Sequence, residues 1–122
     1  MSDKMQHPKE IIRTTLGEYL ARNDVDDTPG VYVVACYPQL GCVYIGKTEN
    51  SVIHRIREHL GSTDSHDRLG SFVRQVFADA CGFRLDILVP PDGCDAAQWL
   101  GDAETRLIHR FGPMLNTVYN AV

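Results

Sequence analysis

The sequence lacks an apolar run long enough to cross a membrane, and its first residues lack the apolar core of a secretion signal. These two absences predict a cytoplasmic protein that contacts no membrane. Internal repeats, linkers and low-complexity stretches are also missing from the 122 residues, a length that suits one compact domain. Hydrophobic content of 43% and charged content of 23% are ordinary for a globular protein. We therefore expect a single domain over residues 1–122.

Metal-binding cysteine patterns are absent, because the sequence has no Cys-x-x-Cys pair and no histidine at zinc-finger spacing. Reduced structural thiols are expected at all four cysteines: Cys36, Cys42, Cys81 and Cys94. A disulfide between Cys36 and Cys42 across a hairpin is the less favoured alternative. The stretch Gly46-Lys47-Thr48 resembles the end of a P-loop but lacks the upstream glycine, so we expect no nucleotide cofactor.

Positive charge is scarce, since 12 Lys and Arg residues face 16 Asp and Glu residues and the formal net charge is −4. This balance argues against broad nonspecific binding to nucleic acid. The cations are nevertheless clustered, with Arg55 and Arg57 on one segment and Arg106 and Arg110 on another. A local basic face on an acidic protein is one interpretation of this clustering, and scattered solvated charges are the other.

Hydrophobic periodicity predicts the order helix, β-hairpin, helix, helix, strand, helix. Expected helices cover residues 8–22, about 51–60, 68–80 and 95–111, and expected strands cover 30–37, 42–46 and 83–89. This order predicts an α+β fold in which a three-stranded antiparallel sheet is flanked by helices. We expect residues 1–28 to form an N-terminal helical extension, outside the core of residues 29–120 that a family resemblance given below implies.

The two hairpin strands each carry a tyrosine, and the register of the hairpin decides whether Tyr32 and Tyr44 share a face. A three-residue loop that ends in a left-handed Gly41 places Cys36 opposite Tyr44 and puts the even-numbered residues of both strands on one side. A loop of even length places the two tyrosines on opposite sides. A shared catalytic role therefore requires the odd loop.

Glu104 lies inside the apolar arc of the last predicted helix, between Leu100 and Ile108. A carboxylate on a packed face loses on the order of several kcal/mol of solvation free energy unless something offsets the loss. Either a cation such as Arg55 pairs with Glu104, or Glu104 lines a pocket and binds a divalent metal ion. A hard cation held by one carboxylate, waters and substrate oxygens suits Mg²⁺ and stabilises charge in phosphodiester cleavage.

Arg55 and His59 are one helical turn apart, beside the apolar stripe of their predicted helix. A guanidinium can hold a phosphate in a bidentate way and stabilise a charged transition state. The general base is either a tyrosine, Tyr32 or Tyr44, or His59. Free tyrosine titrates near pH ~10 and needs positive charge nearby, whereas free histidine titrates near neutrality. Each of these residues also has a plainer explanation. The tyrosines and His59 would be packing residues, and Arg55 would be a solvent-exposed arginine on the helix surface.

These residues together resemble the GIY-YIG nuclease family over roughly residues 29–120. The motifs that carry the resemblance are Gly30-Val31-Tyr32, Tyr44-Ile45-Gly46, Arg55, His59, Glu104 and Asn116. The resemblance implies an endonuclease that hydrolyses phosphodiester bonds in DNA, with one Mg²⁺ or Mn²⁺ ion per site held by Glu104. It implies a first-motif tyrosine as base, Arg55 as transition-state stabiliser, and Asn116 as a brace. Gly46, Lys47 and Arg57 are expected beside the substrate.

Family members often carry a separate DNA-binding domain, and this acidic sequence has none that we recognise. We therefore expect specificity to come from a homodimer, a partner protein or a structured substrate such as a flap or junction. Two other functions stay open: a non-catalytic nucleic-acid or protein interaction module on the same fold, and a ribonuclease. Intact Arg55 and Glu104 argue against the module, and the lack of interleaved stacking aromatics ranks the ribonuclease lower.

Overall fold

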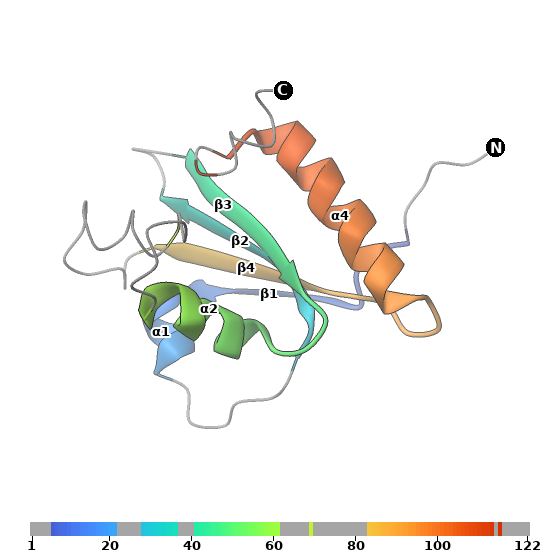
Figure 1. Cartoon of the computed structure of the whole chain (residues 1–122), viewed down its shortest axis with the longest axis horizontal. Coiled ribbons are helices and arrows are strands. Elements are labelled where there is room, and N and C mark those ends of the chain that lie inside the picture. Colours follow the sequence, from blue (N-terminus) through green and yellow to red (C-terminus); the bar gives the residue numbers. More distant parts are fainter. Residues whose placement is uncertain are drawn as a thin grey trace.

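The computed structural model describes residues 6–21, 28–36, 41–61, 69, 83–113 and 115, with the side chains of residues 36, 60 and 61 excepted. The elements run in the order β1 (Glu10–Thr15), α1 (Leu16–Leu20), β2 (Gly30–Cys36), β3 (Gly41–Thr48), α2 (Val52–Gly61), β4 (Arg84–Val89) and α4 (Ala96–Phe111). The strands form one four-stranded antiparallel sheet in the order β1-β4-β2-β3 (Figure 1). The fold is therefore α+β, as predicted. The helix predicted over residues 68–80 falls almost wholly outside the described residues.

The prediction of a three-stranded sheet with an N-terminal helix over residues 8–22 is wrong. Glu10–Thr15 forms a strand that pairs with β4 from Glu10↔Val89 to Thr15↔Arg84, and the helix that follows is only five residues long. The run from Ile11 to Thr15 is rich in β-branched residues, which favour strands. The apolar residues whose spacing suggested one helix belong to two elements. Ile12 faces the core from β1, and Leu16 and Tyr19 face it from α1.

The hairpin of β2 and β3 puts Tyr32 and Tyr44 on the same face, as a shared role requires. Tyr32 lies opposite Gly46 and Val34 lies opposite Tyr44, so Cys36 does not face Tyr44 as the simple loop predicted. The register shifts by one residue after Val34, which is a β-bulge. Gly41 has the predicted positive φ, at 67°.

Two helices begin and end where their local signals predict. Ser51 precedes α2, and its hydroxyl accepts a hydrogen bond from the His54 amide. Asp95 caps α4 by accepting from the Gln98 amide, and Gly112, with a φ of 53°, ends the helix in the left-handed conformation. The sixteen residues of α4 are thus fixed at both ends.

The sheet separates two apolar clusters. On one face, α1 and α2 pack over residues that include Tyr32, Val34 and Ile87. On the other face, Trp99, Leu100 and other residues of α4 pack on Val31 and Ile45 (Figure 1). Because β3 is an edge strand with helices on both sides, side chains from α2, β2, β3 and α4 can meet beside it.

Candidate functional site

Tyr32 and His59 form the centre of the candidate site. The Tyr32 hydroxyl lies 3.0 Å from Nε2 of His59, which is a hydrogen bond between two side chains that are 1% and 3% exposed. Tyr32 comes from β2 and His59 from the last turn of α2, so the bond joins the sheet to the helix. Burying two polar groups is tolerated here because they bond to one another.

Tyr44 completes a cluster of three rings. Its ring centroid lies 6.2 Å from that of Tyr32 and 5.3 Å from that of His59, with the latter pair close to edge-on. Such distances are typical of favourable aromatic contacts. Of the three side chains only Tyr44 is partly exposed, so it forms the solvent-facing side of the ring cluster Tyr32–Tyr44–His59.

Gly46 is required beneath the ring of Tyr32. A Cβ atom at this position would lie 2.5 Å from both Cζ and Oη of Tyr32, a distance at which something must move. The glycine was predicted to let the backbone approach a substrate. Its contact in the structure is instead with the tyrosine of the first motif, which links the two motifs physically.

Arg55 lies on α2 beside the ring cluster. Its positive charge and a hydrogen bond act on Tyr32, and its Nη1 lies 3.6 Å from Oε1 of Glu58. Arg55 also lines a mainly polar pocket of about 590 Å³ at the start of α2, together with Ser51 and His54. A guanidinium is suited to an anionic ligand such as a phosphate, although the carboxylates of Glu49 and Glu58 line the same pocket and oppose an anion there.

Burial raises the pKa of Tyr32 well above its ordinary value of 10.0. The charge of Tyr44 adds to this effect, while the charge and hydrogen bond of Arg55 oppose it, and Glu104 raises the pKa further. The positive charge that a tyrosine base needs is therefore present. Burial, however, raises the pKa of Tyr32 by more than this charge lowers it. Tyr32 is a neutral phenol across the physiological pH range.

Glu104 reaches the same region from α4 and is half-buried. Burial raises the pKa of its carboxyl, and the charge of Lys47 lowers it. The cation that acts on Glu104 is thus Lys47 of β3, whereas Arg55 was the example considered for the ion-pair alternative. Lys47 lies against α4 at Gly101, where an added Cβ would be 3.4 Å from Nζ.

A divalent ion fits this donor set in part. The described residues contain no group of three or more His, Cys, Asp or Glu side chains that could hold a metal by themselves. Glu104 offers one carboxylate whose burial disfavours its charged form, so a cation beside it would recover free energy. A hard ion that takes its other ligands from water and a phosphate matches a single carboxylate.

Comparisons of the chain with protein-family models, with curated proteins and with solved structures found no match. No helix within the described ranges is both long and apolar enough to span a membrane.

Cys42 and Cys94 are free thiols, so the alternative of a disulfide between Cys36 and Cys42 is wrong. Burial raises the pKa of the Cys42 thiol to about 11.

One predicted substrate residue, Arg57, bonds to another part of the structure, and a second, Asn116, is not described. Arg57 points toward α1, where its Nη2 donates to the Leu20 carbonyl oxygen at 3.3 Å. Asn116 lies outside the described residues. Sequence reasoning also missed Gly101, whose small size makes room for Lys47. A glycine inside a helical pattern is a recognisable signal of close packing, and this one stands in the middle of α4.

Proposed function

We propose that this chain is a divalent-metal-dependent endonuclease of the GIY-YIG type that hydrolyses phosphodiester bonds in DNA. The observation that carries the proposal is the hydrogen bond between Tyr32 and His59, with Arg55 and Glu104 both acting on the same phenol. Three elements contribute to this arrangement, namely β2, α2 and, far along the chain, α4. Packing alone gives no reason for two buried polar rings, an arginine and a half-buried carboxylate to share one edge of a sheet.

Arg55 binds the scissile phosphate and stabilises the negative charge that develops on its oxygens. A bidentate contact from the guanidinium would replace its long contact to Glu58. Glu104 holds one Mg²⁺ or Mn²⁺ ion, which polarises the phosphate and stabilises the leaving oxygen when bound. Lys47, exposed on β3, adds a second positive charge close to Glu104.

The general base is the pair of Tyr32 and His59 acting together. A phenol whose pKa is raised by burial is a poor base by itself, because its anion is rarely formed. In the proposed relay a water proton moves to the Tyr32 oxygen while the Tyr32 proton moves to Nε2 of His59. The hydroxide forms the new P–O bond, the P–O bond to the leaving oxygen breaks, and that oxygen takes a solvent proton. His59 then returns its proton to solvent.

The test is nicking of supercoiled plasmid in Mg²⁺ and in EDTA, by the wild type and by Arg55→Ala and Glu104→Gln. Asp102→Asn is the matched control, because Asp102 is an exposed carboxylate on the same helix as Glu104. We expect metal-dependent nicking that both site variants abolish and the control retains. Nicking that survives EDTA or Glu104→Gln contradicts the metal assignment. If plasmid, branched DNA and RNA all stay intact, the fold serves as a binding module instead.

A further inference from the structure

A groove of about 670 Å³ lies on α4 away from the ring cluster. Its walls are α4 and the segment from Gln6 to Pro8 that leads into β1, and its floor includes Leu88 of β4. The surface of the groove is mainly apolar. Volumes in this range are typical of sites that bind another molecule.

The walls of the groove are held in place by hydrogen bonds. The indole Nε1 of Trp99 donates to the carbonyl oxygen of Gln6 at 3.0 Å, which fastens the N-terminal segment to α4. The Lys9 amide donates to the Val89 carbonyl oxygen at 2.9 Å, which fastens the same segment to β4. The groove is therefore a built feature of the fold.

Ile11 extends the apolar floor. It lies directly opposite Leu88 in the pairing of β1 with β4, so the two side chains share a face of the sheet. Ile11 is 41% exposed, one of two large hydrophobic side chains among the described residues that are so open. An exposed isoleucine that continues an apolar groove is typical of a contact surface for another molecule.

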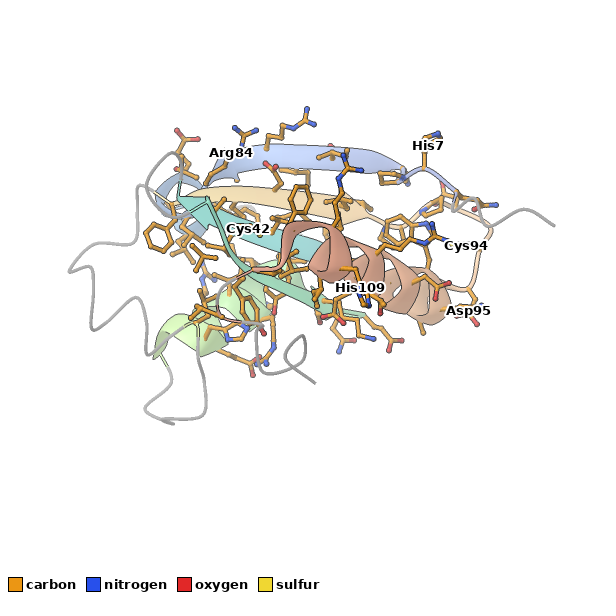
Figure 2. All side chains as sticks on the ribbon, turned by 90° about the horizontal axis from the view of Figure 1, so that it is seen from above. His7, Cys42, Arg84, Cys94, Asp95 and His109 are labelled. Atoms are coloured by element: carbon orange, nitrogen blue, oxygen red, sulfur yellow. The ribbon has the colours of Figure 1, made fainter. Side chains whose placement is uncertain are left out.

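The charge of the groove has one sign. The described lining residues include two arginines and two histidines and no carboxylate: His7, Arg106, His109 and Arg110. The chain as a whole carries a formal net charge of −4, so this region is an exception. Arg110 also lies over the ring of Phe111, with its Cζ 5.8 Å from the ring centroid. In Figure 2, Arg84 lies at the opposite end of the sheet from His7.

We propose that this groove binds a peptide segment of a partner protein in which carboxylates flank a bulky apolar side chain. The apolar side chain would enter between α4 and the N-terminal segment, and the carboxylates would meet the guanidinium groups of Arg106 and Arg110. Arginine is suited to this role because its guanidinium presents donors in a fixed plane to a carboxylate.

A nucleic acid is a poorer fit to the same surface. Phosphates would find the cations, but Trp99 is only 6% exposed and offers no open ring face for stacking a base. The apolar floor at Leu88 and Ile11 would then remain in water. A peptide with an apolar side chain and carboxylates would cover the apolar floor and pair with the arginines at the rim.

The test begins with selection from a random-peptide phage library on the wild-type protein, with counter-selection on Arg110→Glu. Selected peptides that lack tryptophan are then synthesised and titrated while the emission of Trp99, the sole tryptophan, is followed. We expect the selected peptides to be rich in Asp and Glu around an aromatic or aliphatic residue and to shift the emission. The Kd should rise about tenfold or more in Arg110→Glu and in the milder Arg110→Gln.

The matched control is Arg84→Glu, which makes the same charge change away from the groove and should leave the Kd within about twofold. Selected peptides that are basic, or that bind Arg110→Glu as well as the wild type, would overturn the proposal. It is also overturned if a DNA oligonucleotide shifts Trp99 in an Arg110-dependent way and no peptide does, or if a second copy of the chain fills the groove in sedimentation experiments. No readout here uses cleavage, so the proposed nuclease function can fail independently.

Discussion

The two sides of α4 face surroundings that differ in their physical chemistry. Toward β3, Gly101 and Glu104 lie near Lys47, and across the sheet the buried hydroxyl of Tyr32 bonds to His59. Toward β1, the groove exposes an apolar floor and carries its polar groups at the rim. Near β3 several polar groups are buried or half-buried, whereas toward β1 the polar groups are at the border and apolar groups are open.

This difference suits the two regions to different functions, catalysis near β3 and recognition of a partner near β1. Buried polar groups are tolerated only in fixed geometry, because a lost partner leaves an unsatisfied atom, and fixed geometry is what catalysis needs. An open apolar surface with a charged rim accepts varied side chains, which suits recognition. We therefore expect substitutions on one side of α4 to leave the function of the other unchanged, since distant sites are usually additive.

The largest effect should come from Arg55→Ala, which we expect to lower the rate of plasmid nicking by about 10²–10³-fold through lost stabilisation of charge in the transition state. Arg57→Ala is the matched control, since Arg57 stands two positions later on the same helix and bonds to Leu20 instead. Peptide binding in the groove should be unchanged in both variants. Equal losses of activity for Arg55 and Arg57 would show that general positive charge on α2, not a site, is responsible.

Gly46→Ala should lower the free energy of unfolding by about 1–3 kcal/mol, because the new methyl group must displace the Tyr32 ring. Urea denaturation measures this loss. The control is Gly101→Ala, where the nearest atom is the flexible end of Lys47 at 3.4 Å. Replacing a glycine in a helix interior gains about 0.5–1 kcal/mol, so that variant should be neutral or stabilised. If the two variants behave alike, the contact between the motifs is not a constraint.

Tyr32→Phe should change the alkaline limit of stability. Because the pKa of Tyr32 is raised in the folded state, its contribution is complete below the ordinary value of 10.0 and is lost as the pH rises above it. The wild type should therefore lose up to about 1.4 kcal/mol of stability per pH unit above that point relative to the variant. Urea denaturation of both proteins from neutrality to about pH 11 measures the difference. Parallel profiles would mean that Tyr32 is hydrated and not desolvated.

Glu104→Gln should stabilise the protein by about 0.5–1 kcal/mol at neutral pH, even as it abolishes cleavage. Burial raises the pKa of this carboxyl, so its charged form costs stability at neutrality and its protonated form does not. The advantage of the variant should accordingly vanish as the pH falls below the carboxyl pKa. Asp102→Asn, at an exposed position of α4, should give no such gain. Thermal unfolding at neutral and acidic pH distinguishes a buried functional carboxylate from an ordinary surface one.

Much of the fold was predictable because its signals are local. The bounds of α4 follow from Asp95 and Gly112. The shared face of the two tyrosines does not follow from loop length, because Cys36 pairs with Gly41 across an even number of residues and the bulge after Val34 brings the tyrosines to one face. The N-terminal region was not predictable in this way, since its apolar spacing fits a helix and its β-branched residues fit a strand. Pairing with β4, which lies far along the chain, decides the question.

The candidate site was predictable in its members but not in its contacts. Helical periodicity and the resemblance to a nuclease family together singled out Tyr32, Arg55, His59 and Glu104. It did not reveal that Gly46 lies beneath Tyr32, or that Lys47 is the charge beside Glu104, because these contacts depend on how β3 packs against its neighbours. The groove was missed for the same reason, since its walls come from opposite ends of the sequence.

The pairing of β1 with β4 also sets an order in time. The ring cluster joins segments that are close in the chain, whereas β1 must wait for a strand near the other end before it can be added to the sheet. An edge strand that is added late is held by pairing on one side only and tends to open at lower free energy than the central strands. Amide hydrogens of β1 should then exchange with solvent faster than those of β2. A partner bound in the groove would slow that exchange, because it would contact the segment that leads into β1.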